Sequence, residues 1–162
     1  MIVTEGDVYS GYKHTHKGRY FDMVEIISGE KGKGKTKYLL DKVNSDIKKV
    51  DGSVVYIDKN TKHMYELDSK IRLINMGDYP IDSTDEFLGF LSGVLSQNSD
   101  IQEVFLDSFL TVSYIDTNDG FTAALNKLDK VCSMFDVKFV LSVSKNEKDL
   151  PEDAKGKIII SL

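Results

Sequence analysis

Eight residues in the first quarter of the chain combine backbone flexibility with positive charge at a spacing that suits phosphate chemistry. The segment from Gly29 to Thr36 reads GEKGKGKT. Glycines let the backbone turn tightly and bring its N–H groups against phosphate oxygens. A lysine followed by a threonine adds a compact positive charge and a hydroxyl that can ligate Mg²⁺. The spacing therefore predicts a loop that binds a nucleotide with a magnesium ion.

The flanking residues supply the elements that such a loop needs. Residues 23–28, MVEIIS, form a short apolar run and predict a buried strand, and residues 35–50 carry apolar side chains at helical spacing. The N-terminus of that helix adds a partial positive charge beside the phosphates. Lys35 is expected to reach the β- and γ-phosphates. The predicted nucleotide contacts are Gly29, Glu30, Lys31, Gly32, Lys33, Gly34, Lys35, Thr36 and Lys37.

A second acidic residue is needed to complete a magnesium shell. The run IQEVFLDS offers Asp107 at the end of an apolar strand, 101–108. Aspartate is also common in turns that end strands, which is the alternative interpretation. With the glycine-rich loop upstream, we favour Thr36 and Asp107 as the metal ligands.

The rest of the chain alternates between strand and helix patterns. Strands are expected at 52–60, 70–76, 137–144 and 156–162, a short edge strand at 62–67, and helices at 82–97 and 118–136. This alternation predicts an α/β fold, a mainly parallel sheet with helices on both faces. Residues 1–20 are interpreted as a leader that is partly disordered or holds one short strand, and residues 21–162 as one nucleotide-binding domain. Ligands of such sheets bind at the carboxyl ends of the strands.

The order of these segments resembles the RecA-like branch of the P-loop NTPases over most of residues 23–145, and the chain is also similar to small single-domain bacterial P-loop proteins. The resemblance rests on EIISGEKGKGKTKYLL, SVVYIDKN and VFLDSFLTVS, in that order. It implies a Walker A loop, ATP and Mg²⁺ as cofactors, and hydrolase activity. It also implies that the loop strand lies beside a strand with a polar sensor residue, here Ser142 or Ser144.

The sequence departs from this family in its catalytic residues. Asn60 stands after the second strand where RecA-like enzymes usually have a glutamate, and Ser108 follows Asp107 where other P-loop ATPases have one. Asparagine can orient a water molecule but cannot accept its proton. Asp58 is the best candidate base and Glu30 a weaker one, so the catalytic candidates are Lys35, Asp58 and Asn60. We expect slow intrinsic hydrolysis that depends on a partner protein or on self-association.

Two other functions stay open. One is an interaction module that binds nucleotide without turnover, which the missing glutamates favour. The other is a small-molecule kinase, although residues 108–138 contain no arginine to form a phosphate-clamping lid. ATP is favoured over GTP because the guanine-type sequence NKLD, at 126–129, falls within a predicted helix.

Composition limits the remaining classes. The 162 residues are 41% hydrophobic, which is enough for a core, and carry a formal net charge of −5 with only two arginines. This balance argues against direct nucleic-acid binding. One cysteine, Cys132, and no apolar run near the roughly 20 residues of a membrane span predict a cytoplasmic protein.

Overall fold

The computed structural model describes residues 23–162 of the chain. The predicted leader, 1–20, lies outside these residues. Within the described part, strands and helices alternate along the sequence in the order that the apolar patterns predict. The prediction of an α/β fold is therefore confirmed.

Six strands form one sheet in which every neighbouring pair is parallel. The spatial order is β3-β2-β4-β5-β1-β6. The strand that precedes the glycine-rich loop, β1, thus lies beside β5, which carries Ser142, as expected. The strands are β1 (Val24–Ser28), β2 (Ser53–Asp58), β3 (Arg72–Asn75), β4 (Ile101–Leu106), β5 (Lys138–Val143) and β6 (Ile158–Ser161).

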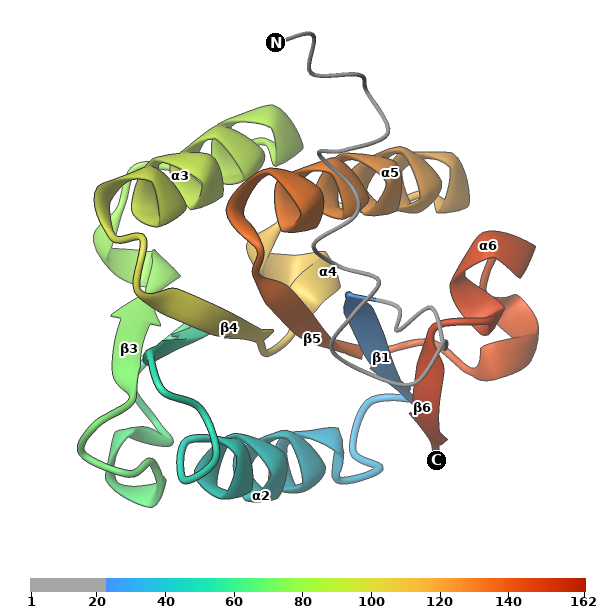
Figure 1. Ribbon diagram of the computed structural model, residues 1–162. Coiled ribbons are helices and arrows are strands. Elements are labelled where there is room, and N and C mark those ends of the chain that lie inside the picture. The colour runs from blue at the N-terminus through green and yellow to red at the C-terminus, as the bar shows by residue number, and fades with distance from the viewer. Residues whose placement is uncertain (1–22) are drawn as a thin grey trace, which may run out of the picture.

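The three long helices cover both faces of the sheet (Figure 1). Helix α2 (Lys35–Asp46) lies on one face, and α3 (Thr84–Gln97) and α5 (Asn118–Phe135) lie on the other. No helix in residues 23–162 is long and apolar enough to cross a membrane. Short helices complete the described chain: α4 (Phe109–Val112), α6 (Glu152–Lys155) and the 3-10 turns η2 (Met64–Glu66), η3 (Met76–Asp78) and η4 (Glu147–Asp149).

The expected edge strand at 62–67 is wrong, because these residues contain the 3-10 turn η2. The segment is fastened to helix α2 instead of to the sheet. Asn44 donates from its side chain to Glu66 O at 2.8 Å, and its side-chain oxygen accepts Asp68 N at 2.8 Å. A short apolar run cannot reveal such a side-chain anchor, which comes from a residue more than twenty positions away.

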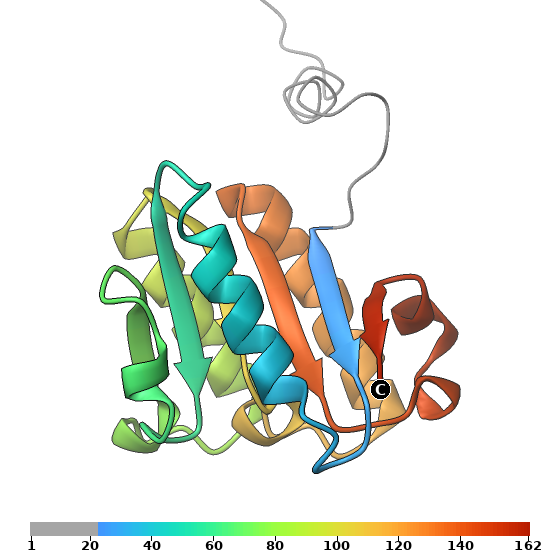
Figure 2. The ribbon, with the colours of Figure 1, turned by 90° about the horizontal axis from the view of Figure 1, so that it is seen from below.

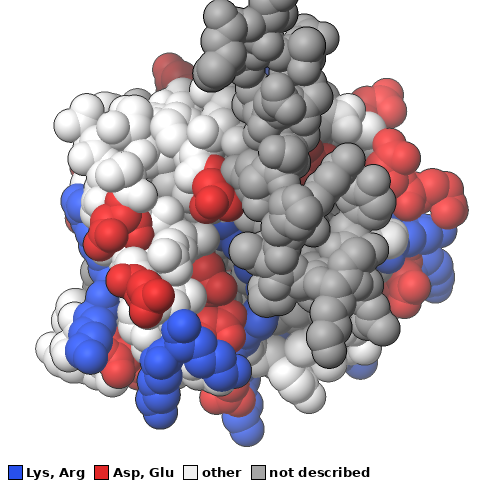
Figure 3. All heavy atoms as spheres, viewed as in Figure 1, with Lys and Arg blue, Asp and Glu red and all other residues white. Residues whose placement is uncertain are grey.

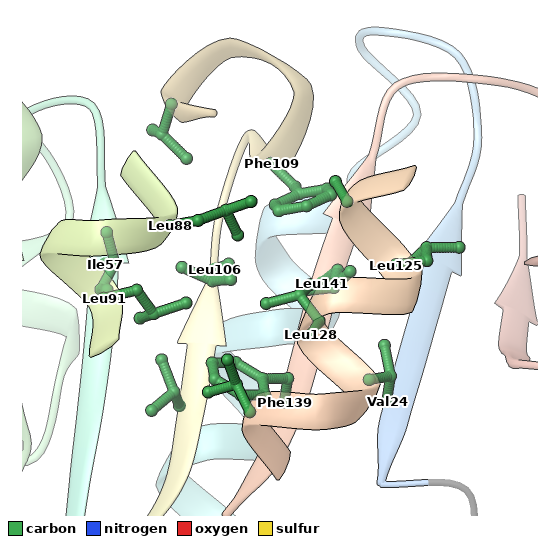
Figure 4. Close-up of a cluster of buried hydrophobic side chains, with 14 of the residues drawn as sticks. Val24, Ile57, Leu88, Leu91, Leu106, Phe109, Leu125, Leu128, Phe139 and Leu141 are labelled. Atoms are coloured by element: carbon green, nitrogen blue, oxygen red, sulfur yellow. The ribbon is translucent and has the colours of Figure 1, made fainter. Parts of the chain in front are cut away.

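The alternation of side chains along each strand divides the core into two parts. One part lies between the sheet and the helices α3 and α5. It contains Leu88 and Leu91 of α3 and Leu125 and Leu128 of α5 (Figure 4). These side chains face the strand residues Leu106, Phe139 and Leu141. Beneath α2, Ile27, Tyr56, Phe105 and Val140 pack against Leu39, Leu40 and Val43. Helix α2 is therefore held by a buried apolar stripe, which fixes where its N-terminus stands.

Helix α3 begins with a reciprocal cap formed by side chains at its N-terminus. The Ser83 hydroxyl accepts Glu86 N at 3.2 Å, and the Glu86 carboxylate accepts Asp82 N at 2.9 Å. These two bonds satisfy backbone donors that a helix N-terminus leaves without partners.

On α5, Cys132 is buried, and the NKLD segment, 126–129, lies inside the helix.

A cluster of charged side chains lies under α2 at the amino ends of the strands. It contains three acidic residues, Glu25, Asp46 and Glu103, and two lysines. Lys138 Nζ lies 2.8 Å from Glu25 Oε1, and Lys42 Nζ lies 3.0 Å from Asp46 Oδ2. We call this group the amino-end cluster. On the surface, basic and acidic side chains are interspersed over the part of the face that is visible in Figure 3.

Candidate functional site

The glycine-rich loop, residues 29–34, joins the carboxyl end of β1 to the first residue of α2. In Figure 2, helix α2 (cyan) lies over one face of the sheet, along the strands, and begins at the end toward which the strand arrowheads point. Gly32 and Gly34 have φ angles of 85° and 88°, in the left-handed region that other residues rarely adopt. Gly29 N donates to Lys145 O at 2.9 Å, so the start of the loop is tied to the residues after β5.

Lys35 and Thr36 occupy the first turn of α2 and point back toward the loop and the sheet. Lys35 is only 7% exposed, and its Nζ donates to Glu30 O at 3.0 Å, across the loop. Burial lowers the pKa of Lys35, and the negative charge of Asp107 partly offsets this effect. The loop thus holds a cation beside backbone N–H groups at a helix N-terminus, an arrangement that favours an anion.

Asp107 is buried directly after β4 and is surrounded by hydrogen-bond donors from other elements. Its Oδ1 accepts the Ser142 hydroxyl at 2.6 Å, Ser108 N at 2.8 Å and the Thr36 hydroxyl at 3.3 Å. Its Oδ2 accepts the Tyr56 hydroxyl at 2.9 Å. The carboxylate is therefore held by donors from α2, β2 and β5 together. We call Thr36, Tyr56, Asp107 and Ser142 the carboxyl-end cluster.

The strand register explains why these residues meet. Phe105 pairs with Tyr56 on one side and with Val140 on the other, and all three pack under α2. Side chains two residues further along each strand return to the same face. This rule places Asp58, Asp107 and Ser142 in one row at the carboxyl ends, under the first turn of α2. Tyr56 lies one step behind Asp58 and reaches Asp107 diagonally.

Asp58, the predicted base, is buried at the end of β2. Burial, and then repulsion by the Asp107 carboxylate, raises the pKa of Asp58, although Lys59 N donates to Asp58 Oδ1 at 2.7 Å. A carboxylate with a raised pKa is a better proton acceptor than one with an ordinary pKa.

The other predicted contacts lie at the surface. Asn60 is exposed, and its Oδ1 accepts Lys62 N at 2.9 Å within its own turn, so it is not directed at Asp107. The Glu30 carboxylate accepts the Asn146 side chain at 2.7 Å, away from the carboxyl-end cluster. Lys31, Lys33 and Lys37 are exposed around the loop. Of the two serines on β5 and its continuation, Ser142 contacts Asp107 and Ser144 is exposed.

The oxygens of Thr36 and Asp107 fit a magnesium ion. They lie 3.3 Å apart, and neighbouring ligands of an octahedral shell with bonds of about 2.1 Å are separated by about 3 Å. No group of three or more His, Cys, Asp or Glu residues that could hold a metal occurs among residues 23–162. Magnesium in phosphate-binding sites typically takes one or two protein ligands and completes its shell with water and phosphate.

A hollow of about 550 Å³ borders the loop on the side of β6. Its lining includes Asn146, which bonds to Glu30, and Ser161, which pairs with Ser28 at the base of the loop. Lys148 and Lys155 add positive charge. Glu147, which also lines the hollow, adds a negative charge, so the lining carries both signs.

Sequence reasoning missed Tyr56, although the signal was present. Tyr56 precedes Asp58 by two residues on an apolar strand, so period-two alternation puts both on one face. The sequence could not show that Tyr56 would lie beside Asp107, because the order of strands in a sheet cannot be predicted from any single segment.

Comparison of the sequence with protein-family models and with curated proteins finds no match in either set. The function of the chain must therefore be inferred from its own residues and their geometry.

Proposed function

We propose that this protein is a Mg²⁺-dependent ATP-binding protein of the P-loop NTPase class, RecA-like branch, with slow hydrolysis that a partner or an oligomer accelerates. The observation that carries the proposal is the contact between Thr36 and Asp107, at 3.3 Å, across 71 positions of sequence. It joins a glycine-rich loop and its lysine to a buried carboxylate on another strand, and nucleotide-binding loops of this kind need that second acid.

Each part of the site has a separate role in this proposal. The loop backbone and Lys35 bind the phosphates, and Thr36 and Asp107 hold the magnesium ion, which neutralises phosphate charge when bound. The hollow beside Asn146 and Ser161 leaves room for the remainder of the nucleotide. The strand order, with β5 between β1 and β4, supports the RecA-like branch.

Slow hydrolysis follows from what surrounds the reacting water. Asp58 is the best candidate for the general base. Its carboxylate is buried, its pKa is raised, and it lies in the same row of side chains as Asp107. Asn60 faces its own turn. Arg72 is the one arginine among residues 23–162. It is exposed at the amino end of β3, whereas the glycine-rich loop lies at the carboxyl ends of the strands. An arginine finger can contribute about 10³–10⁵ in rate, so a partner that supplies one would matter greatly.

A second candidate function is a nucleotide-binding module without turnover. The observation that favours it is the orientation of Asn60 and Glu30 away from the carboxyl-end cluster. Only Asp58 then remains as a base.

The test is calorimetric titration of the protein with ATP and with GTP, with and without Mg²⁺, followed by phosphate-release and phosphate-transfer assays. Saturable binding of ATP that Mg²⁺ strengthens supports the proposal. Release of phosphate that Asp58→Asn abolishes supports the slow ATPase, and binding without release supports the module. Absence of binding to both nucleotides contradicts both functions.

A further inference from the structure

The two oxygens of Asp107 have unequal surroundings. Oδ1 accepts three donors, from Thr36, Ser108 and Ser142, whereas Oδ2 accepts the Tyr56 hydroxyl at 2.9 Å. Rotation of the carboxyl group about its bond to the side chain would exchange these environments. A donor fixed on Oδ2 therefore also fixes which oxygen faces Thr36.

Tyr56 is well suited to be that fixed donor. Its ring is fully buried under α2, in the cluster that contains Leu39, Phe105 and Val140, so packing restrains both of its side-chain torsions. Burial, and then the charge of Asp107, raises the pKa of Tyr56 far above its ordinary value. The phenol hydroxyl is therefore held in place as a donor to the carboxylate.

We infer that Tyr56 is the positioning residue of the magnesium site: its hydroxyl holds Asp107 Oδ2 so that Oδ1 stays directed at Thr36. The inference rests on the proposed function. Tyr56 does not touch the metal or the phosphates in this arrangement. It acts through Asp107, as outer residues of metal sites do when they orient a ligating carboxylate.

Tyr56→Phe removes the hydroxyl and keeps the ring. In titrations of Mg²⁺ at saturating ATP, the Mg²⁺ concentration at half-saturation should rise about tenfold, the usual effect of losing an outer-shell partner. Affinity for ATP without Mg²⁺ should change less than about twofold, since the loop and Lys35 are untouched. Tyr65→Phe is the matched control, because Tyr65 is 91% exposed and lies outside the site. An unchanged Mg²⁺ midpoint, or equal losses with and without Mg²⁺, overturns the inference.

A measurement without any ligand separates this inference from the proposed function. Carbon-13 NMR of labelled aspartate should show that Tyr56→Phe shifts the carboxyl resonance of Asp107, because the carboxylate loses the hydroxyl donor on Oδ2. If the wild-type protein binds no nucleotide, the proposed function fails while this measurement still tests the Tyr56 contact.

The wild-type protein provides a reading that does not depend on the variant folding. A buried, hydrogen-bonded Tyr56 hydroxyl proton should exchange slowly with water and show magnetisation transfer to neighbouring protons of β4. Fast exchange of that proton overturns the inference.

Discussion

Helix α2 covers two polar clusters that lie at opposite ends of the same face of the sheet. In the carboxyl-end cluster, hydroxyl groups of Thr36, Tyr56 and Ser142 surround the carboxylate of Asp107. In the amino-end cluster, lysines pair directly with carboxylates, as Lys138 does with Glu25 at 2.8 Å. One end uses neutral donors and the other uses opposite charges.

The difference distinguishes a cluster with a structural role from the cluster to which we assign ligand binding in the proposed function. Hydroxyl donors orient a carboxylate without forming an ion pair with it, so the Asp107 oxygens are suited to a cation. The lysines of the amino-end cluster neutralise most of the charge around them, so little remains to attract a ligand. Burial of paired charges gives modest net stability. The amino-end cluster therefore serves mainly to attach α2 to the sheet.

The largest expected effect is the loss of the loop lysine. Lys35→Ala should reduce ATP affinity on the order of 100-fold, because a charge-assisted contact with phosphate is removed while the fold persists. Lys42→Ala, on the same helix but in the amino-end cluster, is the control and should leave affinity unchanged. Calorimetric titration measures both. Equal affinities in the two variants would remove the functional distinction between the clusters.

A pair of substitutions on β4 and its continuation sharpens the comparison further. Asp107→Asn keeps the size of the side chain but removes its charge, so the dependence of ATP binding on Mg²⁺ should weaken by about tenfold or more. Glu103→Gln, at the amino end of the same strand, should leave that dependence intact. Magnesium titrations at fixed ATP would test this, and a wild-type response in Asp107→Asn would contradict the metal assignment.

The amino-end cluster should make the stability of the folded protein depend on pH, and should leave ligand binding unaffected. Burial, and then repulsion by Asp46, raises the pKa of Glu103 to about 7 from its ordinary value of 4.5. Between these values the folded protein holds a proton that the unfolded chain releases, so this contribution to stability falls as the pH rises from 4.5 through about 7.

Glu103→Gln should flatten this pH dependence and raise the melting temperature at pH 8 by about 2–4 °C, which corresponds to about 1 kcal/mol. Thermal melts between pH 4 and pH 9 measure the effect. Asp85→Asn changes an exposed carboxylate and should retain the wild-type profile. A wild-type profile in Glu103→Gln would show that other groups dominate.

The smallest effect is expected at Asn60. Asn60→Glu places a carboxylate beside the row that contains Asp58, but at an exposed position whose side chain belongs to its own turn. Phosphate release should therefore rise by only about two- to threefold. A rise of several orders of magnitude would mean that a missing glutamate alone limits turnover. No rise would leave Asp58 or a partner as the relevant factor.

Apolar periodicity predicted the strands and long helices well because each is long enough to bury a continuous stripe. The same local patterns selected Lys35, Thr36 and Asp107 as candidates, since each follows a strand or opens a helix, and the structure brings Thr36 and Asp107 into contact. Periodicity gave no sign that α4 and α6, each of four residues, are helical. The neighbours of Asp107 were harder to predict, because Tyr56 and Ser142 reach it only through strand order and register.

The carboxyl-end cluster also affects how the chain acquires function during folding. Its members come from positions 36, 56, 107 and 142, and they meet only after the parallel strands have assembled through their crossover connections. Contacts of such large sequence separation close late. No fragment that lacks β5 can build the cluster. The proposed binding of Mg²⁺-ATP should therefore appear only with the last strand pairings. Under the proposed function only the native state binds the ligand. The ligand would then stabilise the folded protein by an amount that grows with the logarithm of its concentration above Kd, and binding capacity would count completely folded molecules.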